Sequence, residues 1–228
     1  MARLTWHGHA SFTLVTDDDA RLMFDPWLDD NPAADIGTDQ VQDLDFILVT
    51  HGHEDHFGDA IALARKTGAM LIGIVELAAF AKSKGVERTH GLSIGGGYRF
   101  PFGYAKLTPA LHGPSVAGDD VGAFTCMPAG LWVDLGGKRL YHAGDTALLT
   151  DMQLLRGKVD VALLPIGDNY TMGPEDAARA VEFIEPRIVV PMHYNTFDLI
   201  RQDPAEFARR VGARARVEIL RPGESLEF

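Results

Sequence analysis

Short apolar runs that end at polar or glycine-rich clusters recur along the whole chain. Alternating or continuously apolar runs of this length are typical of β-strands. We therefore predict strands at residues 2–6, 11–16, 20–24, 46–49, 69–74, 104–111, 131–135, 139–142, 159–165 and 187–191. Apolar residues at helical spacing predict helices at 59–66, 76–84 and 204–211, and a further helix begins near Pro174 and Glu175.

The mixed order of strands and helices indicates an α/β (α+β) fold. A chain of 228 residues can bury most of its apolar surface around one core, so we expect a single domain over residues 1–228. No low-complexity tract, internal repeat or long linker interrupts the pattern.

Several predicted strands are followed by a histidine or an aspartate. His51 follows the run 46–49, His112 follows 104–111, Asp145 follows 139–142, and His193 follows 187–191. In sheets flanked by helices, ligands commonly bind at such strand ends. Side chains that are distant in the sequence can therefore meet at one edge of a sheet.

The segment His51-Gly-His53-Glu-Asp55-His56 is the strongest chemical signal. It places four candidate metal ligands within six residues, on a predicted loop between the strand 46–49 and the helix 59–66. Imidazole and carboxylate groups suit Zn²⁺, Fe²⁺ and Mn²⁺. A solvated polar loop is the alternative, but this density of histidine directly after an apolar strand favours a metal site. We expect the intervening Glu54 to be structural.

Composition limits the remaining function classes. A formal net charge of −11 argues against charge-driven nucleic-acid binding, which needs a basic surface. The N-terminal segment has no apolar run typical of a signal peptide, and the longest apolar stretches are too short to span a bilayer. The single cysteine, Cys126, excludes an internal disulfide framework, so we expect a buried thiol and a cytoplasmic protein.

The segment THGHEDH, followed by Gly58, resembles the HxHxDH signature of the metallo-β-lactamase superfamily. His112 in ALHG, Asp145 in HAGDT and His193 in PMHYN fit the later ligand positions of that superfamily in order and spacing. The resemblance covers the whole chain and implies a four-layer αββα sandwich. More narrowly, WHGHAS, DPWLDDNP, YHAGDT, PIGDNYTMGPEDA and PMHYNTF resemble the uncharacterised metal-dependent hydrolases related to ascorbate-6-phosphate lactonase.

The resemblance also implies a role for each ligand. The first metal ion would be held by His51, His53 and His112, the second by Asp55, His56 and His193, and Asp145 would bridge both. Two divalent ions (Zn, Mn or Fe) would hold a bridging hydroxide that attacks the substrate, with Asp55, Asp145 and His193 as catalytic residues.

Two positions depart from other branches of the superfamily. Asp145 stands where thiolate-using β-lactamases have a cysteine, which disfavours antibiotic hydrolysis. His53 stands where flavodiiron oxygen reductases have a glutamate, which disfavours a redox role.

Further polar residues have a functional and a structural interpretation. Asp25 would accept a hydrogen bond from a ligand imidazole, or it caps a turn before Pro26. His9 would line the pocket or contact substrate, or it lies in an ordinary turn. We expect His142 to be a packing or supporting residue and His90 to lie on the surface. The residues that would hydrogen-bond to substrate, or else cap loops, are Asp168, Asn169, Thr171, Tyr194 and Asn195.

Three functions are consistent with these residues. A hydrolase for a small lactone or ester is favoured by the resemblance. A phosphodiesterase for a small or nucleotide-like substrate is the first alternative, because it uses the same dinuclear chemistry. A non-catalytic metal-binding protein is the second alternative, but it is disfavoured because a structural metal site needs fewer than seven ligands. We expect a small-molecule substrate and neither a nucleic-acid nor a membrane partner. The sequence leaves open whether the chain forms a homo-oligomer.

Overall fold

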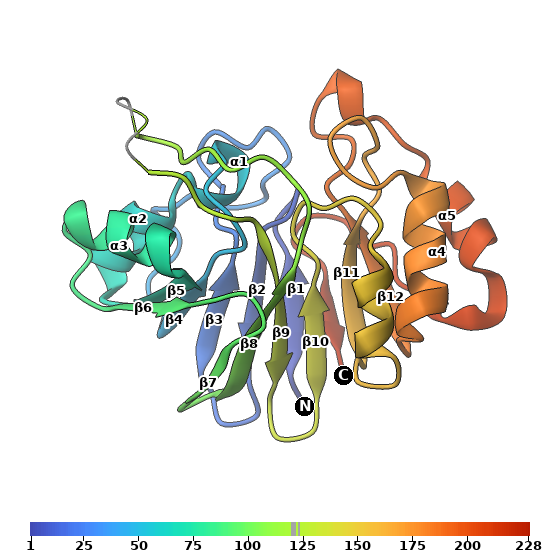
Figure 1. Ribbon diagram of the computed structural model, residues 1–228, viewed down its shortest axis with the longest axis horizontal. Helices are drawn as coiled ribbons and strands as arrows, with labels where there is room; N and C mark the ends of the chain where they lie inside the picture. Colours follow the sequence, from blue (N-terminus) through green and yellow to red (C-terminus); the bar gives the residue numbers. More distant parts are fainter. Residues whose placement is uncertain (120–121, 123) are drawn as a thin grey trace.

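The computed structural model describes residues 1–119, 122 and 124–228, and within them the chain forms two seven-stranded β-sheets (Figure 1). The first sheet has the order β14 (Ser225–Glu227), β1 (Arg3–Trp6), β2 (Phe12–Val15), β3 (Arg21–Phe24), β4 (Phe46–Leu48), β5 (Met70–Ile74), β6 (Thr89–Leu92). The second has the order β13 (Arg216–Val217), β12 (Ile188–Met192), β11 (Val161–Pro165), β10 (Arg139–His142), β9 (Ala129–Asp134), β8 (Gly103–Pro109), β7 (Gly97–Phe100).

Both sheets mix antiparallel and parallel pairs. In the first sheet the pairs from β1 to β3 are antiparallel and those from β3 to β6 are parallel. In the second sheet the pairs from β7 to β10 are antiparallel and those from β10 to β13 are parallel. The parallel strands β3, β4, β10, β11 and β12 are each followed by a loop that contributes to the candidate site described below.

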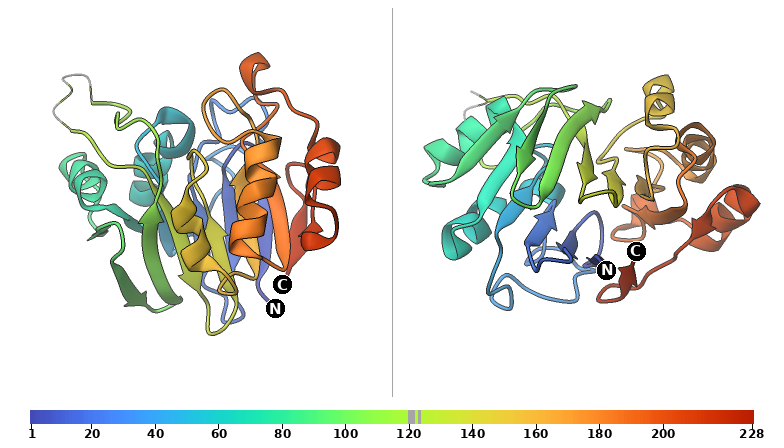
Figure 2. Two further views of the ribbon diagram at one scale, coloured as in Figure 1. Left: turned by 45° about the vertical axis from the view of Figure 1, so that its right-hand side comes forward. Right: turned by 90° about the horizontal axis from the view of Figure 1, so that it is seen from below.

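Helices cover the outer sides of the sheets. The helices α2 (Ala60–Thr67) and α3 (Val75–Ser83) pack on β4, β5 and β6. The helices α4 (Pro174–Ile184) and α5 (Pro204–Val211) pack together beside the second sheet, where α4 also contacts the 3-10 helix η1 (Thr150–Leu155). Figure 2 shows these two groups of helices, teal and orange to red, on opposite sides of the molecule. The predicted α/β class and the sandwich of helices around two sheets are confirmed.

The apolar alternation along the strands produces the core. In β9, Leu131 and Val133 are fully buried, whereas Trp132 between them is only partly buried. Strands β4 and β11 are buried at every position, as their continuous apolar sequences predict. Helix α4 begins at Pro174 and turns Ala177, Val181 and Ile184 toward the core. Among the described helices, none is long and apolar enough to cross a membrane.

Some elements were not predicted from the sequence. Strand β7 begins at Gly97, and its sequence GYRF has no apolar run that would predict a strand. His90 lies in β6 and is only partly buried, with its ring centroid 4.4 Å from that of Tyr98 and 4.9 Å from that of Phe100. Part of the cluster expected on a loop forms a short helix, α1 (Glu54–Phe57), which carries Asp55 and His56.

Candidate metal centre

The candidate metal donors come from loops that follow the strands. His51 lies three residues after β4, His112 three residues after β8, Asp145 three residues after β10, and His193 directly after β12. Gly144 allows the approach of Asp145 to the first sheet. It has a φ of 62°, and an added Cβ would lie 2.8 Å from the Cβ of Thr50.

Six histidines and two aspartates form three overlapping groups of metal donors. In each group the donor atoms lie within 4.8 Å of one another. The groups are His9, Asp55, His56 and His193; His51, His53 and His112; and His51, His56 and Asp145. All seven side chains that the sequence singled out as ligands thus lie at one place, and His9 lies with them.

Asp145 is buried between the groups. Its Oδ1 lies 3.2 Å from His56 Nε2, and its Oδ2 lies 3.0 Å from His193 Nε2 and 3.5 Å from His112 Nε2. The same His112 Nε2 also faces His53 Nδ1 at 3.2 Å. One carboxylate therefore faces imidazoles that belong to two different donor groups.

Asp25 orients the histidines at the base of the site. His56 Nδ1 donates a hydrogen bond to Asp25 Oδ2 over 2.7 Å, which turns His56 Nε2 toward Asp145. Thr50 Oγ1 donates to the same Asp25 oxygen over 2.6 Å, so it accepts from His51 Nδ1 at 3.0 Å. Both hydrogen bonds leave the Nε2 atoms of His51 and His56 free to bind a metal ion. This arrangement fits the interpretation of Asp25 as a partner of a ligand imidazole.

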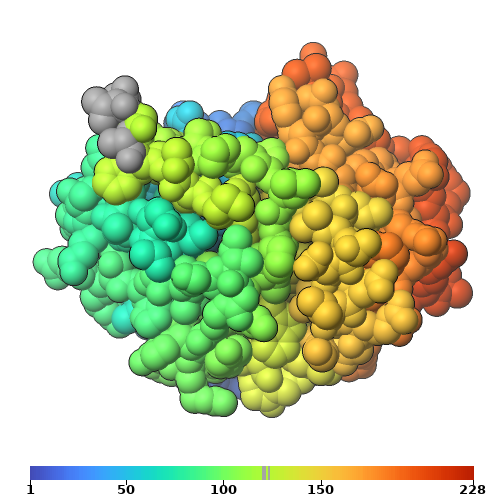
Figure 3. Space-filling view, in the orientation of Figure 1, coloured from blue at the N-terminus to red at the C-terminus, as the bar shows by residue number. Residues whose placement is uncertain are grey.

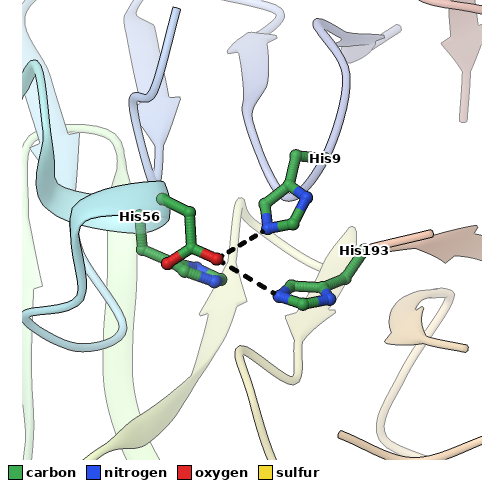
Figure 4. Close-up of side chains that lie close together, drawn as sticks. His9, His56 and His193 are labelled. Atoms are coloured by element: carbon green, nitrogen blue, oxygen red, sulfur yellow. Dashed lines mark hydrogen bonds and ion pairs between the residues drawn. The ribbon is translucent and has the colours of Figure 1, made fainter. Parts of the chain in front are cut away.

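His9 holds Asp55 from the opposite side. Its Nε2 donates to Asp55 Oδ2 over 3.0 Å, and its Nδ1 accepts from Thr196 Oγ1 over 2.8 Å. Figure 4 shows His9 and His193 turned toward the same carboxylate, and the dashed lines end at Asp55 Oδ2. The φ of His9 is 52°, an uncommon backbone conformation for a residue other than glycine. His9 therefore positions Asp55 and does not line the open cavity.

Burial and the close carboxylates shift the pKa values of the buried histidines in opposite directions. Burial lowers the pKa of His51 well below its ordinary value, and it lowers the pKa of His9 to about 4. Burial also disfavours charge on His56 and His193, but the nearby carboxylates together outweigh it, with Asp145 contributing most and Asp55 adding to it. They raise the pKa of His56 well above its ordinary value and that of His193 to about 9. The pKa of Asp145 is held well below its ordinary value by His193 and His56, which outweigh its burial.

A metal ion fits these residues because several buried donor atoms lack a hydrogen-bond partner among the described residues. These atoms are His51 Nε2, His56 Nε2, Asp145 Oδ1 and both ring nitrogens of His193. Asp145 meets His56 Nε2 and His193 Nε2 as ion pairs, whereas His51 Nε2 and His193 Nδ1 have no described partner of either kind. Unpaired buried polar atoms are costly and rare in proteins. A divalent cation would satisfy His51, His56 and Asp145 at once, and the imidazole and carboxylate donors suit Zn²⁺, Mn²⁺ or Fe²⁺.

An open cavity of about 520 Å³ lies over the donors. Its apolar wall comes from Val116, Ala117, Tyr170 and Phe197, which lie on loops outside the metal-binding motif. No lysine or arginine is among the lining residues that the structure describes. The complete lining set is His53, Glu54, Asp55, His112, Ser115, Val116, Ala117, Asp145, Tyr170, His193 and Phe197.

Five residues expected near the substrate are not among those that line the cavity: Asp168, Asn169, Thr171, Tyr194 and Asn195. Tyr194 is buried, and its ring stacks on Trp6 with centroids 5.7 Å apart. Asn195 Oδ1 accepts from Gln202 N at 2.8 Å, which is the loop-capping role given as the alternative.

Sequence reasoning also missed two kinds of residue. Tyr170, which follows Asp168 and Asn169 in the same loop, lines the cavity instead of them. Thr50 orients His51, and Thr196 orients His9. The only sequence signal for these two threonines is a hydroxyl close to a candidate site residue.

Known proteins are similar to this chain in sequence and in fold. Residues 3–193 match the family model of the Beta-lactamase superfamily domain. A UPF0173 metal-dependent hydrolase of Heliobacterium modesticaldum is 47% identical over 234 residues, with 99% of this chain and 97% of that protein covered. A UPF0173 metal-dependent hydrolase of Enterococcus faecalis is 44% identical over 225 residues, with 98% of each covered. The structure of Igni18, a metallo hydrolase from Ignicoccus hospitalis, matches with a TM-score of 0.87 and 37% identity, covering 100% of this chain and 99% of that chain.

The contact between His9 and Asp55 predicts an effect on metal affinity. We expect His9→Ala to weaken metal binding about 10- to 100-fold, because an unsupported ligand loses its orientation. His9→Gln should recover part of the affinity, since its amide can still donate to Asp55. Titration with a competing chelator measures the affinity. His7→Ala is the matched control, because His7 contacts Asp35 and Thr13 instead. Equal affinity in His9→Ala and His7→Ala would show that His9 does not support the site.

The raised pKa of His193 predicts how the stability of the metal-free protein depends on pH. Its folded-state pKa of about 9 lies above the ordinary 6.5, so protonated His193 stabilises the metal-free fold fully below pH 6.5. This contribution is lost as the pH rises through about 9. Thermal unfolding of chelator-treated protein should therefore show a falling Tm over this range. Metal-loaded protein is the control, because a metal ion displaces the proton. A Tm of the metal-free protein that stays level or rises would contradict this assignment.

Proposed function

The chain belongs to the metallo-β-lactamase superfamily and, within it, to the UPF0173 metal-dependent hydrolases, and from this premise we propose that it hydrolyses a small, uncharged ester or lactone at a site for two divalent ions. The observation that carries the proposal is the position of Asp145. The Oδ1 of this buried carboxylate faces His56, and its Oδ2 faces both His193 and His112. A carboxylate between two sets of imidazoles is suited to bridging two cations.

The donor groups suggest which residues hold each ion. His51, His53 and His112 would hold one ion, and Asp55, His56 and His193 would hold the other, with Asp145 shared between them. Zn²⁺, Mn²⁺ and Fe²⁺ all suit these donors, because the set contains imidazole and carboxylate and no thiolate. Cys126 is buried and does not belong to any of the three groups.

When bound, two such ions supply a shared water that loses its proton near neutral pH, and they polarise the bond under attack. The protein's own residues prepare the site for this chemistry. Asp55 and Asp145 balance part of the positive charge, while Asp25 and His9 fix the orientation of His56 and Asp55. Fixed orientation matters because small errors in the placement of reacting groups reduce the rate steeply.

The cavity supports an uncharged substrate. The cationic side chains that usually bind phosphate or carboxylate groups are missing from its described lining. The aromatic rings of Tyr170 and Phe197 instead offer apolar contact, in a volume of about 520 Å³ that suits a small molecule. We therefore propose that the enzyme cleaves a lactone or ester bond, as a lactonase does. The substrate that we propose lacks the phosphate group of an ascorbate-6-phosphate lactone.

The other predictions from the sequence remain parts of the proposal. A reducing cytoplasm is consistent with a single buried thiol. The net charge of −11 is consistent with a small-molecule substrate and with no nucleic-acid partner. One catalytic domain over residues 1–228 is consistent with apolar side chains from both sheets forming one core cluster.

A substrate panel tests the proposal. Metal analysis of the purified protein comes first, followed by assays with Zn²⁺, Mn²⁺ and Fe²⁺ restored separately. We expect neutral lactones and esters to be hydrolysed with at least about tenfold higher kcat/KM than matched substrates that carry a phosphate group, because the cavity offers such a group no cation. Asp145→Asn is the control and should abolish turnover of every substrate.

Two results would contradict the proposal. Hydrolysis of phosphodiesters alone would favour the phosphodiesterase alternative. Absence of hydrolysis with every metal and every substrate class would favour a protein that only binds metal.

A further inference from the structure

A second cavity lies on the outer face of the second sheet. Its volume is about 570 Å³, within the range of small-molecule sites, and it shares no lining residue with the cavity over the metal donors. Strands β8, β9 and β10 form its floor, and η1 forms one wall. Figure 1 shows the outer face of β8 and β9 between the two groups of helices, and Figure 3 shows the same face as a surface.

Strand register explains which side chains face this cavity. Lys106 of β8 pairs with Trp132 of β9, and Trp132 pairs with Tyr141 of β10. Paired residues project from the same face of a sheet, so these three side chains form a row. Leu107, Leu131 and Leu140 alternate with them and fill the core. The row therefore belongs to the outer face, beside η1.

One side of the cavity is a fixed aromatic surface. The indole Nε1 of Trp132 donates to the carbonyl of Lys158 over 2.7 Å, which holds the ring in place. The ring of Tyr104 meets it edge to face, with centroids 6.3 Å apart. Leu154 of η1 is 69% exposed at the rim. An aromatic or aliphatic group would find apolar contact on this side.

A buried hydroxyl without a partner lies on the other side. Thr108 is 7% exposed, and its Oγ1 has no hydrogen-bond partner among the described residues. Beside it lies the phenol of Tyr141, whose pKa burial raises to about 12 against a smaller opposing effect of the Thr108 hydroxyl, so the phenol stays neutral. Native proteins leave few buried hydroxyls unpaired, and an unpaired one calls for an explanation such as a ligand.

The charge at this cavity is positive, although the chain as a whole is acidic. Two lysines, Lys106 and Lys158, line the cavity with one acid, Asp151. Neither lysine forms an ion pair within residues 1–119, 122 and 124–228. Lys158 Nζ donates to the carbonyl of Leu154 over 3.0 Å, which leaves two of its hydrogens for another acceptor. An unpaired ammonium next to neutral hydroxyl donors favours an anionic acceptor.

We propose that this cavity binds a small organic carboxylate, with its apolar body against Trp132 and its carboxylate near Thr108 and Lys106. A carboxylate fits better than a phosphate dianion, because the cavity combines a few donors with one acid and a large apolar wall. The proposal does not depend on the reaction at the metal donors, because the two cavities are separate.

Calorimetric titration of the metal-loaded protein with 4-phenylbutyrate tests the proposal. The neutral alcohol 4-phenylbutanol has the same apolar body and serves as the matched ligand. We expect saturable binding of one carboxylate and at least about tenfold weaker binding of the alcohol, because it loses the charge-assisted contact. Lys106→Gln and Thr108→Val should each weaken phenylbutyrate binding about tenfold for the same reason. Lys82→Gln, on an exposed position of α3, should leave it unchanged.

Thr108→Val also has a stability readout. Because the hydroxyl has no partner within the described protein, replacing it with a methyl group should leave the Tm unchanged or raise it. Weaker binding in a variant that is at least as stable would therefore report lost contact with the ligand and not lost structure.

Three results would overturn the proposal. Equal affinity in the wild type, Lys106→Gln and Thr108→Val would show that the carboxylate binds elsewhere, for example at the metal donors. Absence of saturation up to about 10 mM would show that the cavity does not recognise carboxylates. Sedimentation that shows a dimer, dissociated by Lys106→Glu, would identify a second copy of the chain as the occupant.

Discussion

The structure depends on a dense group of titratable side chains held together inside the protein. Six histidines and two aspartates meet at the ends of strands from both sheets, and His9, His51, His56, Asp145 and His193 are buried. Burial of charge is unfavourable unless opposite charges and hydrogen bonds compensate it. Here the carboxylate of Asp145 stabilises protonated His56 and His193, and a divalent cation would replace those protons as the partner of Asp145. The two sheets meet at this point, because Asp145, in the loop after β10 of the second sheet, lies against His56, in α1 after β4 of the first.

A second layer of polar residues keeps the donor atoms directed at one space. Asp25 accepts from His56 and from Thr50, and Thr50 in turn accepts from His51. His9 performs the same task for Asp55 from the N-terminal segment. Because His51 and His56 are each fixed through Nδ1, their Nε2 atoms are available to a cation. Outside this layer the two cavities differ in their basic side chains, since no described lysine or arginine lines the first and two lysines line the second.

Much of the fold and of the donor set could be predicted from the sequence for physical reasons. Buried strands such as β4 and β11 have continuous apolar sequences, and the C-terminal ends of parallel strands meet at one sheet edge. The strands β6 and β7 escaped prediction because THGL and GYRF lack an apolar run, and they form through pairing with β5 and β8. The contact of His9 with Asp55 joins residues 46 positions apart, and no local pattern specifies it. Loop conformation likewise decides that Tyr170, and not Asp168, faces the cavity.

Anomalous diffraction from crystals of the metal-loaded protein tests the central claim most directly. If Asp145 bridges two cations, data collected at the metal absorption edge will show two peaks about 3.5–4 Å apart, one on each side of its carboxylate. His51, His53 and His112 should surround one peak, and Asp55, His56 and His193 the other. A single peak, or peaks beyond the reach of Asp145, would contradict the account.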